Sequence, residues 1–189
     1  MTDVLAICGS PRHGGNTEIL LTTVLEDLAK KGYSTKLIHL DDKRLAACTG
    51  CGECAELKDC IFQDDMQPIL AEMEAARAIL LGSPTYFSSA TAQLMALLDR
   101  AFYVARRKGN TMRHKIGAAV VSARRAGHNF TFAQLNFYFL ISEMVVPGST
   151  YWNVSLGDER KGYAREDAEA MRTMHALAEN IAWLLERLE

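Results

Sequence analysis

The chain has 189 residues, of which 49% are hydrophobic and 23% are charged, so a disordered or collagen-like protein is excluded. The 21 basic and 23 acidic residues leave a formal net charge of −2, which argues against nucleic acid or an anionic membrane as the main partner. No apolar run reaches the length of a membrane span, and the first residues lack the basic-then-apolar order of a signal peptide. We therefore expect a single cytoplasmic domain over residues 1–189.

Short apolar runs alternate with helical patterns along the chain. Strands are expected at residues 4–8, 34–40, 78–81, 116–121 and 144–146. Helices are expected at residues 17–31, directly after the Asp64-Asp65 pair, and at 90–106, 130–142 and 165–188. Five strands that alternate with helices through right-handed crossovers predict an α/β domain, with a parallel sheet between two helical layers.

The loop over residues 9–17 joins the first strand to a helix N-terminus, which attracts anions through its unpaired N–H groups and its dipole. It is not a P-loop, because Gly15 stands where Lys is needed, and Pro11 breaks the dinucleotide fingerprint. Cys8 is interpreted as a buried strand residue. The loop predicts a phosphate site, with a plain glycine-rich connection as the alternative; its candidate donors are Ser10, Arg12, Asn16 and Thr17.

Two motifs carry a family resemblance. The pattern G-S-P-R-x-x-G-N-T over residues 9–17 and the GSPTYF segment over residues 82–87 resemble loops of the NAD(P)H-dependent FMN reductase family. The similarity covers residues 3–188, and residues 93–100 resemble the family's following helix. The resemblance implies a flavodoxin-like fold with strand order 2-1-3-4-5, FMN as cofactor, NAD(P)H as possible electron donor, and a homodimer or homotetramer.

The second and third loops extend this site. Pro84, Tyr86 and Phe87 offer a rigid, flat and apolar flank for a flavin ring, although core or interface packing is the alternative for the aromatic residues. The third loop, residues 122–128, has only one glycine and two arginines, either of which could offset negative charge or remain solvated. The FMN-binding residues expected from the three loops are Ser10, Arg12, Gly15, Asn16, Thr17, Pro84, Thr85, Tyr86, Phe87, Ser122, Arg125 and Gly127.

Four of the five cysteines lie close together, at Cys48, Cys51, Cys54 and Cys60. Structural zinc sites usually combine two separated cysteine pairs, so one compact segment better suits an iron–sulfur cluster, although the last spacing departs from the ferredoxin run. The pattern resembles the iron–sulfur flavoprotein branch of the same family, which implies a [4Fe–4S] cluster on an insertion at residues 45–61. The alternative is a cluster-free loop of reduced, metal-free or zinc-bound thiols.

The remaining polar residues give weaker signals. His39, His114 and His175 show no partner pattern and are expected to be structural or exposed, and the Asp41-Asp42 and Asp64-Asp65 pairs are interpreted as caps or solvated residues. The aromatic residues of segment 130–139 are expected to form core and subunit interface.

The expected function is an FMN-dependent oxidoreductase that couples two-electron flavin chemistry to one-electron transfer, with no side-chain nucleophile or general base. Its donor and acceptor would be small molecules or redox proteins. The alternatives are a cluster-free NAD(P)H-dependent FMN or quinone reductase, and a non-enzymatic electron carrier or thiol/metal sensor.

Overall fold

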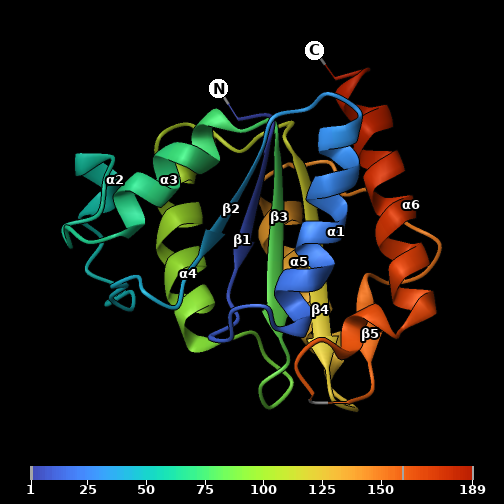
Figure 1. The fold of residues 1–189 in the computed structure, drawn as a ribbon. Helices are drawn as coiled ribbons and strands as arrows, with labels where there is room; N and C mark the ends of the chain where they lie inside the picture. The colour runs from blue at the N-terminus through green and yellow to red at the C-terminus, as the bar shows by residue number, and fades with distance from the viewer. Residues whose placement is uncertain (1, 159, 189) are drawn as a thin grey trace.

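Five parallel strands form the centre of the structure, a computed structural model that describes residues 2–158 and 160–188 (Figure 1). Each strand pairs with its neighbours in the order β2-β1-β3-β4-β5, which confirms the flavodoxin-like order expected from the sequence. Val4 lies opposite both Thr35 and Ala78, so β1 occupies the middle of the first three strands. The strands are β1 (Val4–Cys8), β2 (Thr35–His39), β3 (Ala78–Pro84), β4 (Ile116–Ala123) and β5 (Val154–Leu156).

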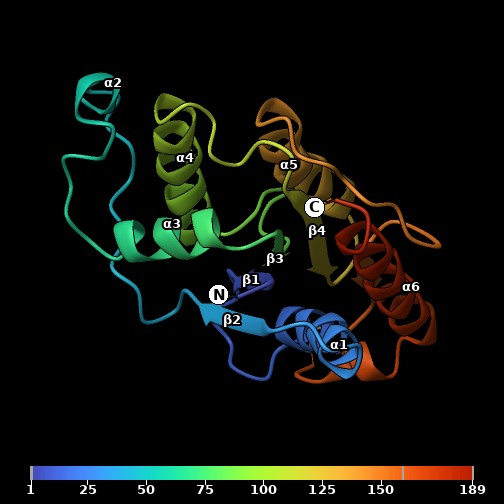
Figure 2. The same cartoon turned by 90° about the horizontal axis from the view of Figure 1, so that it is seen from above.

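Helices cover both faces of the sheet, as the view in Figure 2 shows. One face packs against α1 (Asn16–Lys30) and α6 (Ala168–Leu185). The other face packs against α3 (Met66–Ala75), α4 (Ala92–Arg107) and α5 (His128–Ile141). These two apolar layers confirm the three-layer sandwich.

The strands are apolar on both sides because alternate side chains enter different cores. In β1, Val4, Ala6 and Cys8 join the core beneath α1 and α6, whereas Leu5 and Ile7 join the core beneath α3, α4 and α5. All five residues are fully buried. The interpretation of Cys8 as a buried strand residue is therefore confirmed, and burial raises the pKa of its thiol to about 12.

The fifth strand differs from the sequence prediction. The apolar run at residues 144–146 makes only an isolated bridge, between Val145 and Ile116, and the regular strand β5 lies at residues 154–156. Pro147 has no N–H group to continue the ladder, so the chain leaves the sheet edge after the bridge. It returns at Asn153, whose carbonyl accepts from Val121 N–H at 2.9 Å.

The cysteine segment lies after β2, as expected, and is an outlying loop beside α4 (Figures 1 and 2). It contains the single-turn helix α2 (Cys54–Leu57), and a second short turn, η1 (Tyr163–Arg165), precedes α6. Within the described residues, every helix is too short or too polar to cross a membrane.

Candidate functional site

A cavity of about 220 Å³ lies at the carboxyl ends of the strands, where ligands bind in open α/β sheets. It gathers residues from all three loops singled out in the sequence. Nine of the twelve predicted FMN-binding residues line it: Ser10, Arg12, Gly15, Asn16, Thr17, Pro84, Thr85, Tyr86 and Ser122. Phe87, Arg125 and Gly127 lie outside its lining.

The first loop has the shape of an anion cradle. Gly15 adopts an extended conformation before α1, and a Cβ at this position would lie 2.8 Å from the Arg12 carbonyl oxygen, so only glycine fits. No described side chain caps the start of α1, which leaves the N–H groups of its first turn to a ligand. The Thr17 hydroxyl lies 2.8 Å from the Ser122 hydroxyl and ties this loop to the end of β4.

The Asn16 side chain forms hydrogen bonds to a segment that is distant in sequence, residues 160–164. Its amide oxygen accepts from Gly162 N–H and Ala164 N–H, each at 3.1 Å, and its amide nitrogen donates to the Arg160 carbonyl at 3.1 Å. Asn16 therefore lines the cavity, but in this structure its side chain positions the segment before α6. That segment brings Lys161 to the cavity wall.

Three cations give the cavity its charge: Arg12, Arg124 and Lys161 all line it, with Asp158 as the carboxylate beside them. The pKa of Asp158 is lowered, chiefly because its carboxylate accepts hydrogen bonds from the Arg160 backbone and side chain. The balance of charge favours an anionic ligand such as a phosphate monoester.

The second loop supplies a flat wall with an unpaired polar atom. Pro84 and Tyr86 line the cavity, and Thr85 N–H donates to the Ser122 carbonyl at 2.8 Å. The Thr85 hydroxyl is buried and has no hydrogen-bond partner among residues 2–158 and 160–188. A buried group of this kind is expected to bind a ligand or water, so the cavity fits a polar, partly aromatic molecule such as FMN.

Two of the predicted FMN-binding residues that lie outside the cavity lining have left-handed backbone conformations in its loops. Phe87 lies fully exposed at the tip of the second loop, with a left-handed backbone (φ 50°). Gly127 is also left-handed (φ 91°), and a Cβ there would meet the Ser88 hydroxyl at 2.5 Å, so glycine lets the third loop approach the second.

One wall of the cavity, formed by β5 and the residues after it, was not predicted from the sequence. Ser155, Gly157, Asp158, Lys161 and Tyr163 line the cavity together with Ala123 and Arg124 of the third loop. The signal was hidden because the fifth strand was predicted at residues 144–146. A strand placed at 154–156 would have marked the following residues as a fourth loop at the same edge of the sheet.

A second cavity, of about 310 Å³, is lined by all four clustered cysteines. Cys48 and Cys51 are exposed, Cys54 and Cys60 are half-buried, and all four are free thiols. Gly50 and Gly52 of this segment are left-handed, at φ 68° and 83°, a backbone conformation that glycine adopts without steric cost. Four cysteine side chains around one cavity supply the type of ligand that an iron–sulfur cluster or a zinc ion takes.

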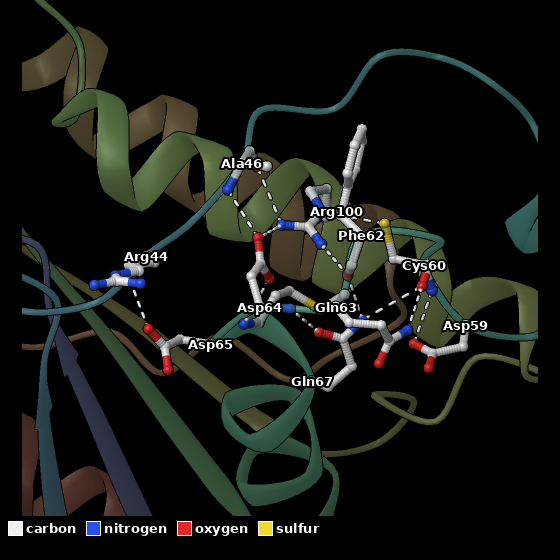
Figure 3. Close-up of polar contacts among 11 residues, drawn as sticks. Arg44, Ala46, Asp59, Cys60, Phe62, Gln63, Asp64, Asp65, Gln67 and Arg100 are labelled. Atoms are coloured by element: carbon white, nitrogen blue, oxygen red, sulfur yellow. Dashed lines mark hydrogen bonds and ion pairs between the residues drawn. The ribbon is translucent and has the colours of Figure 1, made fainter.

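Arg100 joins this cysteine segment to α4 (Figure 3). Its side chain is almost completely buried, and its Nε donates to Cys60 Sγ at 3.2 Å. One terminal nitrogen donates to Asp64 at 2.6 Å and to the Ala46 carbonyl at 3.1 Å, and the other donates to the Phe62 carbonyl at 3.0 Å. A single guanidinium thus fixes both ends of the cysteine segment and contacts one of the candidate metal ligands.

Asp64 completes this network and takes one of the two roles expected for it, that of a cap. Its carboxylate accepts from Ala46 N–H at 2.8 Å and from Met66 N–H at 3.0 Å, so it stabilises the start of α3, as a capping residue would. It is not merely solvated, however, because it also pairs with Arg100. Burial raises the pKa of Asp64, but the hydrogen bonds from Arg100 and the backbone outweigh this effect and the pKa is lowered.

The structure supplies partners that the sequence pattern did not show. His39, expected to be structural or exposed, is largely buried, and its Nε2 lies 2.7 Å from the Glu18 carboxylate. His175 is exposed, as expected, and its Nδ1 contacts the Asp27 carboxylate.

The strand order and the cation-lined cavity define a flavodoxin-like protein. The family model of the NADPH-dependent FMN reductases matches residues 2–159, and the chain therefore belongs to this family. An iron–sulfur flavoprotein of Methanocaldococcus jannaschii is 37% identical over 186 residues, with 95% of each chain covered. An iron–sulfur flavoprotein of Methanosarcina thermophila is 32% identical over 188 residues, covering 98% of this chain and 96% of that protein.

Solved structures support the fold at lower sequence identity. The structure of RosB with a bound riboflavin-phosphate intermediate superposes with a TM-score of 0.76 at 14% identity, covering all of this chain and 80% of that one. The Trp repressor binding protein of Bacillus subtilis gives a TM-score of 0.68 at 17% identity, with 93% and 97% of the two chains covered.

Proposed function

We propose that this chain is an FMN-dependent iron–sulfur oxidoreductase that couples two-electron flavin chemistry to one-electron transfer through a [4Fe–4S] cluster. The observation that carries the proposal is the pairing of two cavities in one domain: a cation-lined cavity at the sheet edge, and a separate cavity lined by four cysteines. The names of the full-length relatives support the same combination.

The residues of the first cavity would hold FMN without taking part in covalent chemistry. The N–H groups at the start of α1, with the Ser10 and Thr17 hydroxyls, would bind the phosphate, and Arg12, Arg124 and Lys161 would balance its charge. A bound flavin would accept and release either a hydride or single electrons.

The second loop has a different task in this cavity. Pro84 and Tyr86 would flank the flavin ring, and the unpaired Thr85 hydroxyl would form a hydrogen bond to one of its polar edges. The chain's contribution to the reaction is therefore position and electrostatics.

The cysteine cavity would hold the cluster through Cys48, Cys51, Cys54 and Cys60. Because Arg100 donates to Cys60 Sγ, it would stabilise the more negative, reduced state of the bound cluster. None of the described residues lines both cavities, so the two cofactors would occupy distinct places within a chain.

A homodimer or homotetramer is part of the proposal, since a second subunit would bring a cluster of one chain towards the flavin of another. The exposed apolar side chains of α5 support this assembly, because a patch of this kind is typical of an interface. They are Phe130, Phe137, Leu140 and Ile141. The electron donor would be NAD(P)H or a redox protein, and the acceptor a small molecule or another redox protein.

One purification tests the proposal. The protein is isolated without oxygen, and its visible spectrum, iron and acid-labile sulfide are measured for the wild type, Cys54→Ser and Cys8→Ser. We expect flavin bands after FMN addition in all three, and iron with sulfide in the wild type and Cys8→Ser but not in Cys54→Ser. Flavin without iron would leave the cluster-free reductase, and zinc in place of iron would favour the thiol/metal sensor.

A kinetic measurement separates an enzyme from a carrier. Stopped-flow mixing with NADH or NADPH is expected to bleach the flavin absorbance within the turnover time of a reductase. If neither nucleotide bleaches the flavin but a reduced ferredoxin-type protein does, the chain acts as an electron carrier.

A further inference from the structure

Four ionisable side chains meet beside the outer strand β2. None of them lines either of the two cavities described above, although one belongs to the loop after β1, which also contributes to the first cavity. We call His13, Glu18, His39 and Asp41 the two-histidine cluster. His13 lies in the loop after β1, Glu18 in the first turn of α1, His39 at the end of β2, and Asp41 two residues later. The His39 side chain is 12% exposed and the two carboxylates are each 23% exposed, so three of the four are largely withdrawn from water.

The contacts within the cluster divide the ring nitrogens into two sets. Asp41 lies 2.7 Å from Nε2 of His13 and 3.2 Å from Nδ1 of His39. Glu18 Oε2 lies on the other side, 2.7 Å from Nε2 of His39 and 4.0 Å from Nδ1 of His13. The two rings stack at a centroid distance of 4.2 Å. Each ring therefore faces Asp41 with one nitrogen and Glu18 with the other.

This division matches the way in which proteins orient metal-binding histidines. A ligating histidine commonly donates its second ring N–H to a carboxylate, which fixes the tautomer and turns the free lone pair towards the metal. If Asp41 accepts from both rings, the lone pairs of His13 Nδ1 and His39 Nε2 converge on Glu18. One ligand atom from each of these three residues lies within 4.8 Å of the others.

The spacing is close to what a metal requires. Metal–nitrogen and metal–oxygen bonds of about 2.0–2.1 Å place tetrahedral ligand atoms about 3.3 Å apart. The His39–Glu18 distance of 2.7 Å is shorter than this value and the His13–Glu18 distance of 4.0 Å is longer, so each needs to change by less than about 1 Å. Two imidazoles and one carboxylate are a ligand set of iron(II) and zinc sites.

One pair of buried polar atoms in the cluster lacks hydrogen bonds to the described residues. His39 Nδ1 and Asp41 Oδ1 are 3.2 Å apart but are not aligned as a hydrogen bond, and neither has a hydrogen-bond partner among the described residues. Transfer of His39 Nε2 from Glu18 to a metal would free the ring to turn and align this pair. A buried polar pair is expected to be hydrogen-bonded, so this realignment would favour the metal-bound arrangement.

We propose that His13, His39 and Glu18 bind one divalent transition-metal ion of the zinc or iron(II) class, and that Asp41 is a positioning residue for both imidazoles. A surface depression of about 390 Å³ is lined in part by His13, His39 and Asp41, though not by Glu18, and brings solvent to both imidazoles. The exposed side of His13 leaves room for a water or an exogenous ligand as the remaining donor. The site has no sulfur ligand, which distinguishes it chemically from the cysteine cavity.

Metal binding would add a further connection between the loop after β1, the start of α1 and the end of β2. His13 belongs to the loop after β1, and the neighbouring Gly14 N–H donates to Glu18 at 2.7 Å. An ion at this position would therefore fix the loop against the end of β2. The proposal does not depend on FMN or on the cluster, because none of its ligands serves either one.

The test uses full-length protein, isolated anaerobically with its native cysteine cofactor, and Zn²⁺ as the probe. Binding is measured by calorimetry for the wild type, His39→Gln, His13→Gln, Asp41→Asn and His175→Gln. The last variant is the matched control, because His175 is also paired with a carboxylate, outside the cluster. Far-UV circular dichroism monitors folding, and the exposed His13 provides a variant that is not expected to disturb the core.

We expect one Zn²⁺ per chain in the wild type and His175→Gln, more than 100-fold weaker binding in His13→Gln and His39→Gln, and 10- to 100-fold weaker binding in Asp41→Asn. X-ray absorption at the zinc edge should show only nitrogen and oxygen ligands at about 2.0–2.1 Å, without sulfur at about 2.3 Å. Equal zinc binding in His13→Gln and the wild type, or a sulfur-only shell, would overturn the proposal and leave the cluster as an ion-pair network.

Discussion

Replacement of Arg100 by Lys keeps the positive charge but removes the planar fork that holds the cysteine segment. A lysine ammonium can still reach Asp64, but it cannot at the same time serve Cys60, Ala46 and Phe62. Three hydrogen bonds are lost at about 1 kcal/mol each, so we expect Arg100→Lys to lower the free energy of unfolding by about 3 kcal/mol. For a chain of this size that corresponds to a fall in melting temperature of roughly 6–12 °C.

The assay is thermal and urea unfolding of the cluster-free, reduced protein, followed by circular dichroism. Arg107→Lys is the control, because Arg107 lies on the same helix but is exposed and stacks over Tyr103 at 4.9 Å. A surface exchange of this kind should change stability by less than about 0.5 kcal/mol. If Arg100→Lys has the same melting temperature as Arg107→Lys, the hydrogen bonds of Arg100 do not stabilise the fold and the reasoning is refuted.

The same variant has a second readout once a cluster is assembled. A hydrogen bond to a cysteine ligand stabilises the reduced state more than the oxidised state, so its loss lowers the reduction potential. A difference of about 1 kcal/mol corresponds to about 40 mV for one electron. Redox titration followed by electron paramagnetic resonance should show this shift for Arg100→Lys, and no shift for Arg107→Lys.

Three further predictions concern the flavin cavity and the core. Arg124→Ala should weaken FMN binding about 10-fold in a fluorescence titration, whereas Arg125→Ala, outside the cavity lining, should stay within about 2-fold; equal losses would count against the assignment. Above pH 9 the unfolded Cys8 thiol loses its proton while the folded thiol keeps it to about pH 12, so stability falls with rising pH. Cys8→Ala should remove up to about 1.4 kcal/mol of this fall per pH unit. If the unfolding free energies of the wild type and Cys8→Ala, measured in urea at pH 8, 9.5 and 11, fall by the same amount, the prediction is wrong. Asn16→Ala should speed tryptic cleavage after Lys161, because four hydrogen bonds to that segment are lost; an unchanged rate would contradict this role.

Much of the fold follows from local pattern. Strands such as β1 and β3 are continuous apolar runs because they are buried on both faces, and this signal needs no knowledge of tertiary contacts. The loops at their carboxyl ends then fall at one edge of the sheet, which is why nine predicted residues share a cavity. The compact spacing of the cysteines likewise predicts a shared site from sequence alone.

The rest depends on contacts that a local pattern does not record. Strand β5 has three residues at the sheet edge, and the nearby run at 144–146 is more apolar, so the stronger local signal gave the wrong strand and hid the wall that contains Lys161. Arg100 lies among the apolar positions of α4, where a charged side chain is explained by partners 36 to 54 residues earlier in the chain, among them the carboxylate of Asp64. His39 gains its partners through the packing of β2 beside α1, and neither the strand nor the helix predicts that contact separately.

The connection between Cys60 and Arg100 also has a consequence for the order of events during synthesis. The arginine that holds the cysteine segment is made 40 residues after the last of the four cysteines. At about 5–20 residues per second, the thiols leave the ribosome roughly 2–8 s before their anchor is available. During this interval the segment has neither its buried ion pair nor the surface of α4 to pack against. Delivery of a metal or cluster is therefore expected to be productive only after α4 has been synthesised and has folded onto the sheet.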